Sequence, residues 1–228
     1  MPRTAIVAGV GPGLGASLAR KFADEGCSLG LFARSGEYVE SLAADLPMPV
    51  MGVEVDVTDP DAVTRGFERV RDELGPIEIL VNHASGATWK GLQDCSSDEF
   101  EHAWRVAAYG GFLCSKEALS DMLDNGGTIL FTGATSSVRG RGGAVGFSSA
   151  KFAVRGLAES MARELGPKGI HVAHVVIDGG ILPSETDVDS TEDYLDPDAI
   201  AESYWHLVEQ DKSAWTLELD VRPHAEGF

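Results

Sequence analysis

Thr4-Ala-Ile-Val-Ala-Gly-Val-Gly-Pro-Gly-Leu-Gly-Ala-Ser-Leu-Ala-Arg20 is the stretch that decides the fold of this chain. Its apolar residues 5–8 predict a buried strand, and the amphipathic run from Leu14 predicts a helix after the glycine-rich turn. Glycines let the backbone turn tightly and let a ligand approach closely, while the N-terminus of a helix offers free N–H groups and a positive dipole. Glycines alone also occur in flexible loops, but here a strand precedes them and a helix follows. The stretch therefore predicts a cradle for the diphosphate of a dinucleotide, formed by Gly9, Gly11, Gly13, Leu14 and Gly15.

Strand and helix patterns alternate along the whole chain. Strands are expected at 5–8, 27–32, 50–57, 77–81, 128–131, 170–177 and near 217–221. Helices are expected from residue 14, through 38–46, over 60–74, from 96 to about 123, over 147–165 and near 198–208. Asp59 with Pro60, and Ser96 with Glu99, are the residue types that begin helices. Nearly continuous apolar strands that alternate with helices are typical of an α/β fold with a parallel sheet covered on both faces. No linker or repeat divides residues 1–228, so a single domain is expected.

Composition limits the classes of partner. The chain of 228 residues carries 36 Asp and Glu against 18 Lys and Arg, so nucleic acid and anionic membrane surfaces would repel it. No apolar stretch reaches the ~18 residues that a membrane span needs, and the start of the chain lacks the pattern of a signal peptide. The three cysteines are an odd number without metal-ligand spacing, which predicts reduced thiols, no metal site and a cytoplasmic location.

In parallel sheets of this kind, ligands bind at the carboxyl ends of the strands. The residues expected at that edge are Gly9–Gly15, Arg34, Asp56, Val57, Asn82, Ala84, 133–137, Gly179 and Ile181. About 20 residues after the glycines, an acidic side chain would bind the ribose 2′-hydroxyl of NAD, whereas an arginine would accept the 2′-phosphate of NADP. Arg34 stands there, which predicts NADP(H) as the preferred cofactor and NAD(H) as the alternative. An ordinary solvated arginine is the competing interpretation.

With these segments in order, the chain resembles the short-chain dehydrogenase/reductase family over nearly its whole length. The motifs that carry the resemblance are Gly9-x3-Gly13-x-Gly15, Asp56-Val57-Thr58-Asp59, Val81-Asn82-His83-Ala84, Phe147-Ser-Ser-Ala-Lys151, Ile170-His-Val and Asp178-Gly179-Gly180-Ile181. The resemblance implies a Rossmann-type doubly wound parallel sheet of about seven strands. It also implies a nicotinamide cofactor, a small-molecule substrate and a homodimer or homotetramer.

The resemblance also implies four catalytic positions, and three of them lack their polar atoms here. The tyrosine of the family falls on Phe147, while its lysine is kept as Lys151. Counting back 13 residues without gaps places the serine on Ala134, and the helix asparagine falls on Ala107. Because positions 147 and 151 are one helical turn apart, Lys151 is still expected to reach the ribose of the cofactor.

Other residues near these positions carry the groups that Phe147 and Ala134 lack. A shift of register by one or two residues would bring Thr135, Ser136 or Ser137 to the serine position. His83 stands at the second asparagine of the Asn-Asn-Ala-Gly motif of the family. It can donate a proton or contact the cofactor, and a packed histidine at a strand end is the alternative.

Phenylalanine has no proton to transfer, and losing a positioned general acid costs about 10²–10⁴-fold in rate. Three hypotheses follow. The first is an NADP-dependent oxidoreductase that acts on a small organic carbonyl, imine or activated alkene with a non-standard proton donor. The second is a non-redox lyase, dehydratase or cyclase, and the third is a catalytically inactive nucleotide-binding protein on the same fold.

An acidic segment near 184–198 falls where the family places a mobile substrate lid. If it closes over the cleft, its carboxylates would repel anionic substrates. A solvated acidic loop is the alternative.

Overall fold

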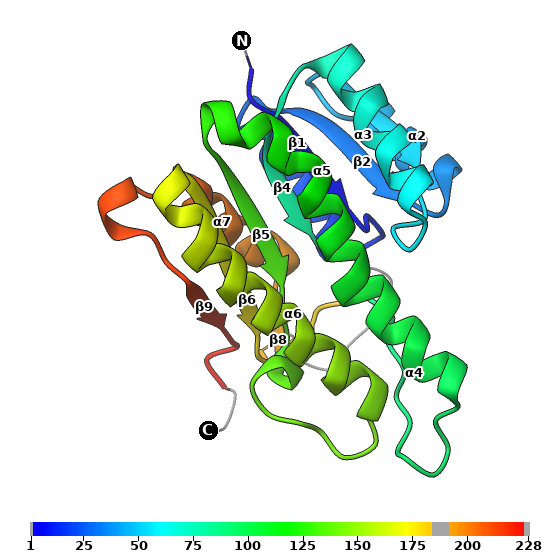
Figure 1. The fold of residues 1–228 in the computed structure, drawn as a ribbon. Coiled ribbons are helices and arrows are strands. Elements are labelled where there is room, and N and C mark those ends of the chain that lie inside the picture. The colour runs from blue at the N-terminus through cyan, green and yellow to red at the C-terminus, as the bar shows by residue number, and fades with distance from the viewer. Residues whose placement is uncertain (1, 184–191, 226–228) are drawn as a thin grey trace.

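A seven-stranded parallel sheet forms the centre of the computed structural model, which describes residues 2–183 and 192–225. The strand order is β3-β2-β1-β4-β5-β6-β9 (Figure 1). The strands are β1 (Thr4–Ala8), β2 (Ser28–Ala33), β3 (Val50–Glu54), β4 (Ile77–Asn82), β5 (Gly127–Thr132), β6 (Ile170–Ile177) and β9 (Glu218–Val221). The chain starts at β1 in the middle, winds outward to β3 and then returns to build the other half from β4. This is the doubly wound topology expected from the sequence.

Helices cover both faces of the sheet (Figure 1). One face carries α3 (Pro60–Leu74), α4 (Ser97–Trp104), α5 (Gly110–Asn125) and α6 (Val145–Leu165). The other carries α1 (Leu14–Asp24), α2 (Gly36–Ala44) and α7 (Pro197–Val208). Strand β1 explains why two cores form: Ile6 and Ala8 point into the first and Ala5 and Val7 into the second. Because the side chains of a strand alternate between the two faces of the sheet and those of β1 are apolar on both, helices must cover both faces.

Short elements complete the chain. They are the turns η2 (Thr135–Ser137), η3 (Gly166–Lys168) and η4 (Lys212–Ala214), and a small second sheet of β7 (Gly180–Ile181) and β8 (Tyr194–Leu195). None of the helices formed by the described residues has the length and apolar character needed to span a bilayer.

Two predicted helix starts are confirmed. The side chain of Asp59 accepts from the N–H groups of Asp61 and Ala62, and Pro60 is the first residue of α3. At α4, Ser96 and Glu99 form the reciprocal capping box, each side chain accepting from the other's N–H.

Two predicted boundaries are wrong. Strand β3 ends at Glu54 and not at Val57, because the carboxylate of Asp56 accepts from the N–H and hydroxyl of Thr58 and closes a turn. Helix α6 starts at Val145, two residues before the predicted start at Phe147.

The long helix expected from residue 96 is interrupted by a π-helical turn, η1 (Arg105–Tyr109). Beyond it, α5 packs so closely that a Cβ on Gly110 would lie 2.8 Å from Val57. A widened turn of this kind is frequent at functional sites, and it leaves no mark in hydrophobic spacing.

Candidate cofactor and active site

A residue that directly follows each of the six strands β1 to β6 lines a cleft at one edge of the sheet. These residues are Gly9, Arg34, Val55, His83, Gly133 and Asp178. The cleft consists of three cavities of about 1090, 450 and 340 Å³. Gly9 lines all three, so the cavities meet at the glycine-rich turn. The carboxyl edge of the sheet is thus hollowed as the sequence predicts.

The middle cavity, of about 450 Å³, is lined by Gly9, Gly11, Pro12, Gly13, Leu14 and Gly15 together with Ile181. A Cβ on Gly9 would lie 2.4 Å from the backbone N and Cα of Ala84, and its φ of 101° also favours glycine. Gly13 has a φ of 103° and stands at the N-cap of α1 without any capping side chain. Among the described residues, no group accepts from the N–H of Leu14 or Gly15. This turn therefore fits the diphosphate of a dinucleotide.

The smallest cavity, of about 340 Å³, holds Arg34, Asp56, Val57 and Ala84 in its lining. Arg34 makes no salt bridge with any described residue, so its guanidinium is available to a ligand. The N–H of Thr58 donates to Asp56 at 2.8 Å and holds the pKa of that carboxyl below its usual value. The cavity, which Lys151 does not line, thus offers one positive and one negative group.

Asn82 is the one predicted cofactor residue that lines none of these three cavities. It is buried at the end of β4, where its Nδ2 donates to Ser115 Oγ on α5 at 3.1 Å. Its Oδ1 has no hydrogen-bond partner among the described residues. The side chain therefore ties β4 to α5 and does not face the cleft.

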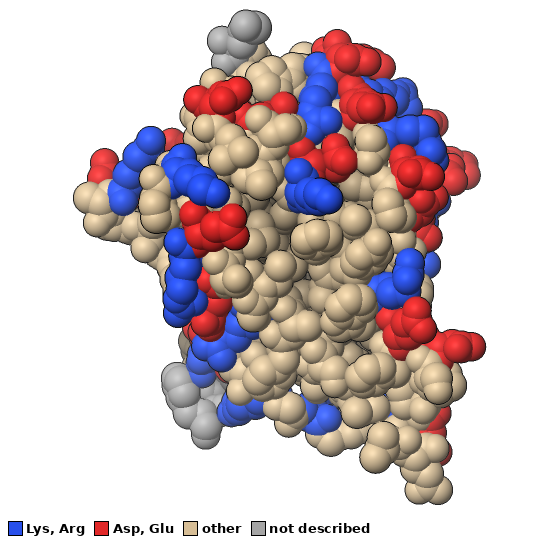
Figure 2. Space-filling model, viewed as in Figure 1, with Lys and Arg blue, Asp and Glu red and all other residues tan. Residues whose placement is uncertain are grey.

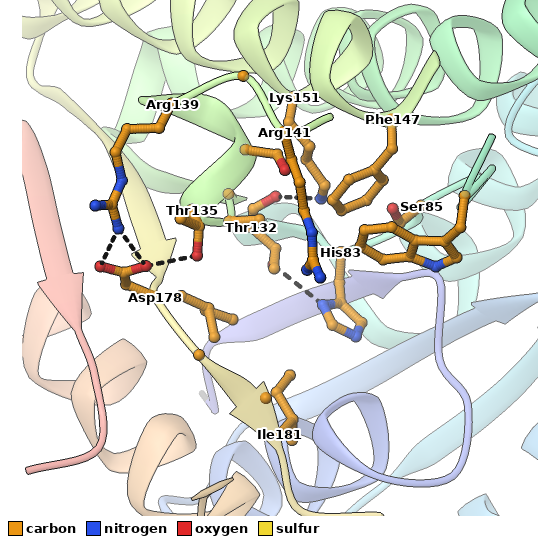
Figure 3. A pocket seen from close by; sticks show the side chains of 18 of the residues that line it. His83, Ser85, Thr132, Thr135, Arg139, Arg141, Phe147, Lys151, Asp178 and Ile181 are labelled. Carbon is orange, nitrogen blue, oxygen red and sulfur yellow. Dashed lines mark hydrogen bonds and ion pairs between the residues drawn. The ribbon is translucent and has the colours of Figure 1, made fainter. Parts of the chain in front are cut away.

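The largest cavity contains Lys151, whose side chain is only 2% exposed (Figure 3). Its Nζ donates to the backbone oxygen of Thr132 at 2.8 Å, and burial lowers the pKa of Lys151 to about 8. One helical turn earlier, the ring of Phe147 lies with its centroid 5.6 Å from that Nζ. A second aromatic ring, Trp89, packs on Phe147 at 4.8 Å. A buried ammonium group thus sits beside an apolar wall.

His83 is half-buried between the largest and middle cavities. Its Nδ1 lies 3.1 Å from Thr132 Oγ1, which in turn is 2.8 Å from the hydroxyl of Tyr204 on α7. Loss of hydration, and secondarily the charge of Lys151, lower the pKa of His83 to about 4. Because the imidazole is neutral at neutral pH, it holds no extra proton to give to a ligand.

Ala134, Thr135 and Ser136 all line the largest cavity. The hydroxyl of Thr135 donates to Oδ1 of Asp178 at 2.6 Å, so its proton is committed to a carboxylate. Ser137 is fully buried and accepts from the N–H of Ala134. The structure therefore brings Ala134, Thr135, Phe147, Lys151 and His83 together. Among the hydroxyls of residues 135–137, those of Thr135 and Ser137 have partners within the protein.

The profile of the short chain dehydrogenase family matches residues 3–194. The chain belongs to the short-chain dehydrogenase family. This is an oxidoreductase family whose members bind NAD(P)(H), so the family and the sheet predicted from the sequence are confirmed.

Relatives support the assignment along most of this short-chain dehydrogenase. Meso-2,3-butanediol dehydrogenase of Serratia marcescens is 33% identical over 174 residues, which cover 76% of this chain and 69% of that protein. A solved short-chain dehydrogenase from Rhodopseudomonas palustris is 35% identical with a TM-score of 0.85, covering 97% of this chain and 99% of that one. The alcohol dehydrogenase of the archaeon Thermococcus sibiricus, solved with 5-hydroxy-NADP, is 25% identical with a TM-score of 0.89, covering 100% and 99%.

Sequence reasoning missed several residues that line the largest cavity of this short-chain dehydrogenase, notably Arg139, Arg141 and Trp89. The two arginines lie in the segment between β5 and α6, which the sequence marks only as glycine-rich. The signal that could have indicated them is the presence of two basic residues in a loop that follows a strand, in a chain that is otherwise acidic. Trp89 carries no such signal, because an isolated tryptophan in a loop is not distinguishable from a packing residue.

Proposed function

We propose that this protein is an NADP(H)-dependent oxidoreductase of a small organic carbonyl, imine or activated alkene, in which Lys151 replaces the tyrosine as proton donor. The observation that carries the proposal is the placement of the Lys151 ammonium beside Phe147 in the largest cavity. Position 147 has no transferable proton, and the neighbouring Thr135 donates its hydroxyl hydrogen to Asp178. His83 is neutral at neutral pH because its pKa lies at about 4. Lys151 is the remaining acid of suitable strength.

The geometry of Lys151 suits this role. An ammonium has three N–H bonds, and Thr132 accepts one of them, which leaves two for ligands. With a pKa of about 8, the group is protonated at neutral pH and releases a proton more readily than an exposed lysine. When bound, the nicotinamide supplies a hydride to the substrate or accepts one from it. Lys151 gives its proton to the atom of the substrate that gains negative charge, and water then restores the ammonium.

Cofactor binding is the first test. Mixing NADPH with the protein is expected to change the fluorescence of the reduced nicotinamide, and a panel of carbonyl, imine and enone compounds should then consume NADPH absorbance. No affinity for NADPH or NADH would contradict the proposal. Binding without turnover would favour the catalytically inactive nucleotide-binding protein, which the apolar side chains of Phe147, Ala134 and Ala107 also support. A non-redox lyase, dehydratase or cyclase would convert a substrate without a change in NADPH.

The preference for NADP(H) rests on Arg34. Arg34→Asp is expected to weaken NADPH binding by about 10- to 100-fold, because a charge-assisted hydrogen bond contributes about 1.5–3 kcal/mol. NADH binding should change by less than about threefold, since NADH has no 2′-phosphate. The dissociation constants of both cofactors are measured by fluorescence titration. Arg163→Asp on α6 is the control for the same change of net charge. Equal losses for the two cofactors would exclude Arg34 from binding the 2′-phosphate.

Restoring the tyrosine alone should not create an ordinary ketone reductase. Phe147→Tyr is expected to raise kcat/KM for simple ketones by less than about tenfold, because Ala134 and Ala107 supply no second hydrogen-bond donor to the carbonyl oxygen. Phe147→Leu serves as the control for lost ring packing against Trp89. A gain of about 100-fold or more in the tyrosine variant would mean that a hydroxyl among residues 135–137 already fills the serine role.

A homodimer or homotetramer is also proposed. Figure 2 shows a face with few charged side chains over α4, α5 and α6. Large apolar side chains on these helices are 41–47% exposed: Phe100, Trp104, Phe112, Leu123 and Phe152. Clusters of exposed large apolar side chains often mark protein–protein contacts. Light scattering that gives the mass of a single chain would contradict this assembly.

A further inference from the structure

The largest cavity contains a guanidinium group that the proposed mechanism does not use. Arg141 extends from the loop before α6 into this cavity (Figure 3). Its Cζ lies 5.5 Å from the ring centroid of Trp89, and its backbone N–H donates to Ser148 Oγ at 3.1 Å. No carboxylate of the described residues lies within salt-bridge distance of it. Arg141 is therefore anchored at its backbone, and its guanidinium lies over Trp89 without an anionic partner among the described residues.

The lining of the largest cavity carries more positive than negative groups. Arg139, Arg141 and Lys151 are its cationic groups, and Asp178 is the only acid among the described residues that line it. Asp178 is 4% exposed and already accepts from Thr135 at 2.6 Å. The guanidinium groups of Arg139 and Arg222 lie 3.4 Å from its carboxylate. Its charge is thus balanced locally, which leaves Arg141 and Lys151 as uncompensated positive groups in a chain with a net charge of −18.

Flat apolar surfaces border these charges. The ring of Trp89 is in contact with both the Arg141 guanidinium and the ring of Phe147. Trp89 is 57% exposed although it is a large aromatic residue, and Ile181 forms part of the facing wall. Together these groups match a ligand that has one flat apolar part and one anionic part.

We propose that this cavity selects a planar organic carboxylate, whose carboxylate group pairs with Arg141 and whose apolar plane lies against Trp89 and Phe147. Guanidinium and carboxylate form two parallel hydrogen bonds, which fix both the position and the orientation of the ligand. The reactive carbonyl or alkene of such a substrate then extends toward Lys151. That last step rests on the proposed function, whereas recognition of the carboxylate does not.

The acidic segment near 184–198 raises the opposite expectation, because its carboxylates would repel an anion. Residues 184–191 lie outside the described residues, so this expectation stays a prediction. Asp196, within the described part, accepts from the N–H of Asp198 as the N-cap of α7 and does not line the cavity. Measuring the affinity for an anion decides between the two expectations.

Cinnamate and cinnamamide are suitable probes, because they share one flat shape and only cinnamate carries a negative charge. Isothermal titration calorimetry on the full chain, with and without NADP⁺, is expected to show cinnamate binding at least about tenfold more tightly than cinnamamide. Arg141→Gln should weaken cinnamate about 10- to 100-fold and leave cinnamamide unchanged, while Arg141→Lys should recover part of the loss. Arg163→Gln on the exposed end of α6 is the matched control and should change neither.

A second variant tests the apolar wall. Trp89→Ala is expected to weaken cinnamate and cinnamamide to a similar extent, because both use the same flat surface. Equal affinities of the two probes for the unmodified protein, or an unchanged cinnamate affinity in Arg141→Gln, would overturn the proposal. NADPH titration of the same preparation separates this failure from failure of the proposed function. If the protein binds NADPH but shows no preference for cinnamate over cinnamamide, only the carboxylate site is contradicted. If cinnamate binding depends on Arg141 but the protein has no affinity for NADPH, only the oxidoreductase function is contradicted.

Discussion

Replacing Lys151 with methionine will lower kcat by about 10²–10⁴-fold on the panel compound that the unmodified protein turns over fastest. The reason is the loss of the acid of suitable strength that the described residues place beside Phe147 in the largest cavity. Saturating NADPH must be used, because Lys151 is also expected to contact the ribose of the cofactor. Lys168→Met, which removes an exposed lysine on η3, is the control and should retain full activity.

The pH dependence separates proton donation from simple positioning. Burial lowers the pKa of Lys151 to about 8, and a lysine is protonated below its pKa. The rate of reduction should therefore be level below pH 8 and fall about tenfold per pH unit above it. In Lys151→Met this decline should disappear together with most of the rate. A decline that persists unchanged in the variant would assign the proton to another group.

Stability should change little in the same variant. The pKa of Lys151 is lower in the folded chain than the 10.5 of a free side chain, so the buried ammonium costs folding free energy below pH 8. This cost, about 3 kcal/mol by the difference in pKa, disappears as the pH rises from 8 toward 10.5. Methionine removes it, but leaves the buried oxygen of Thr132 without its donor at a cost of about 1–3 kcal/mol. The two effects oppose each other, and urea unfolding at pH 7 measures the balance.

Gly9→Ala is expected to weaken NADPH binding about 100-fold and to lower the free energy of unfolding by about 2–4 kcal/mol. Its new Cβ would lie 2.4 Å from the backbone of Ala84, at a φ of 101° that side chains other than glycine rarely adopt. Backbone atoms cannot move aside as a flexible side chain can. The turn must therefore shift and carry the N–H groups at the start of α1 away from the diphosphate.

Gly11→Ala provides the matched control, because it lies in the same turn without a positive φ. Apart from its chain neighbours, none of the described residues places an atom within 4 Å of its added Cβ. Thermal unfolding and NADPH titration are measured on both variants. Gly11→Ala should keep the melting temperature of the unmodified protein. If the two variants melt alike and bind NADPH alike, the contact between Gly9 and Ala84 does not shape the site.

The sheet and much of its edge follow from local sequence. The strand, glycine turn and helix at residues 4–24 form as predicted because glycine at positions 9 and 13 is needed for their φ values. Asp59 and Ser96 likewise begin helices through bonds to residues no more than three positions away. Features that depend on neighbours close in sequence are thus the ones that sequence patterns predict well.

The remaining features depend on contacts between distant segments. The turn η1 lies between α4 and α5, and the residue that follows it, Gly110, packs closely against Val57, which is 53 positions earlier. The sequence predicts no partner for Thr135, yet its hydroxyl donates to Asp178, 43 positions later. Arg141 and Trp89 meet across 52 residues of chain. The spacing of residues within a single helix or strand cannot predict such contacts between distant segments.

The contrast between the net charge of −18 and the cationic lining of the largest cavity affects how fast an anion is captured. Outside the mouth of this cavity, a carboxylate or a dinucleotide experiences the electrostatic field of the whole negatively charged chain, which repels it. At physiological ionic strength that field is screened over about 8 Å, so the approach is slowed most in dilute buffer. Adding salt should therefore accelerate association with this protein, whereas it retards association with proteins whose overall charge attracts the ligand.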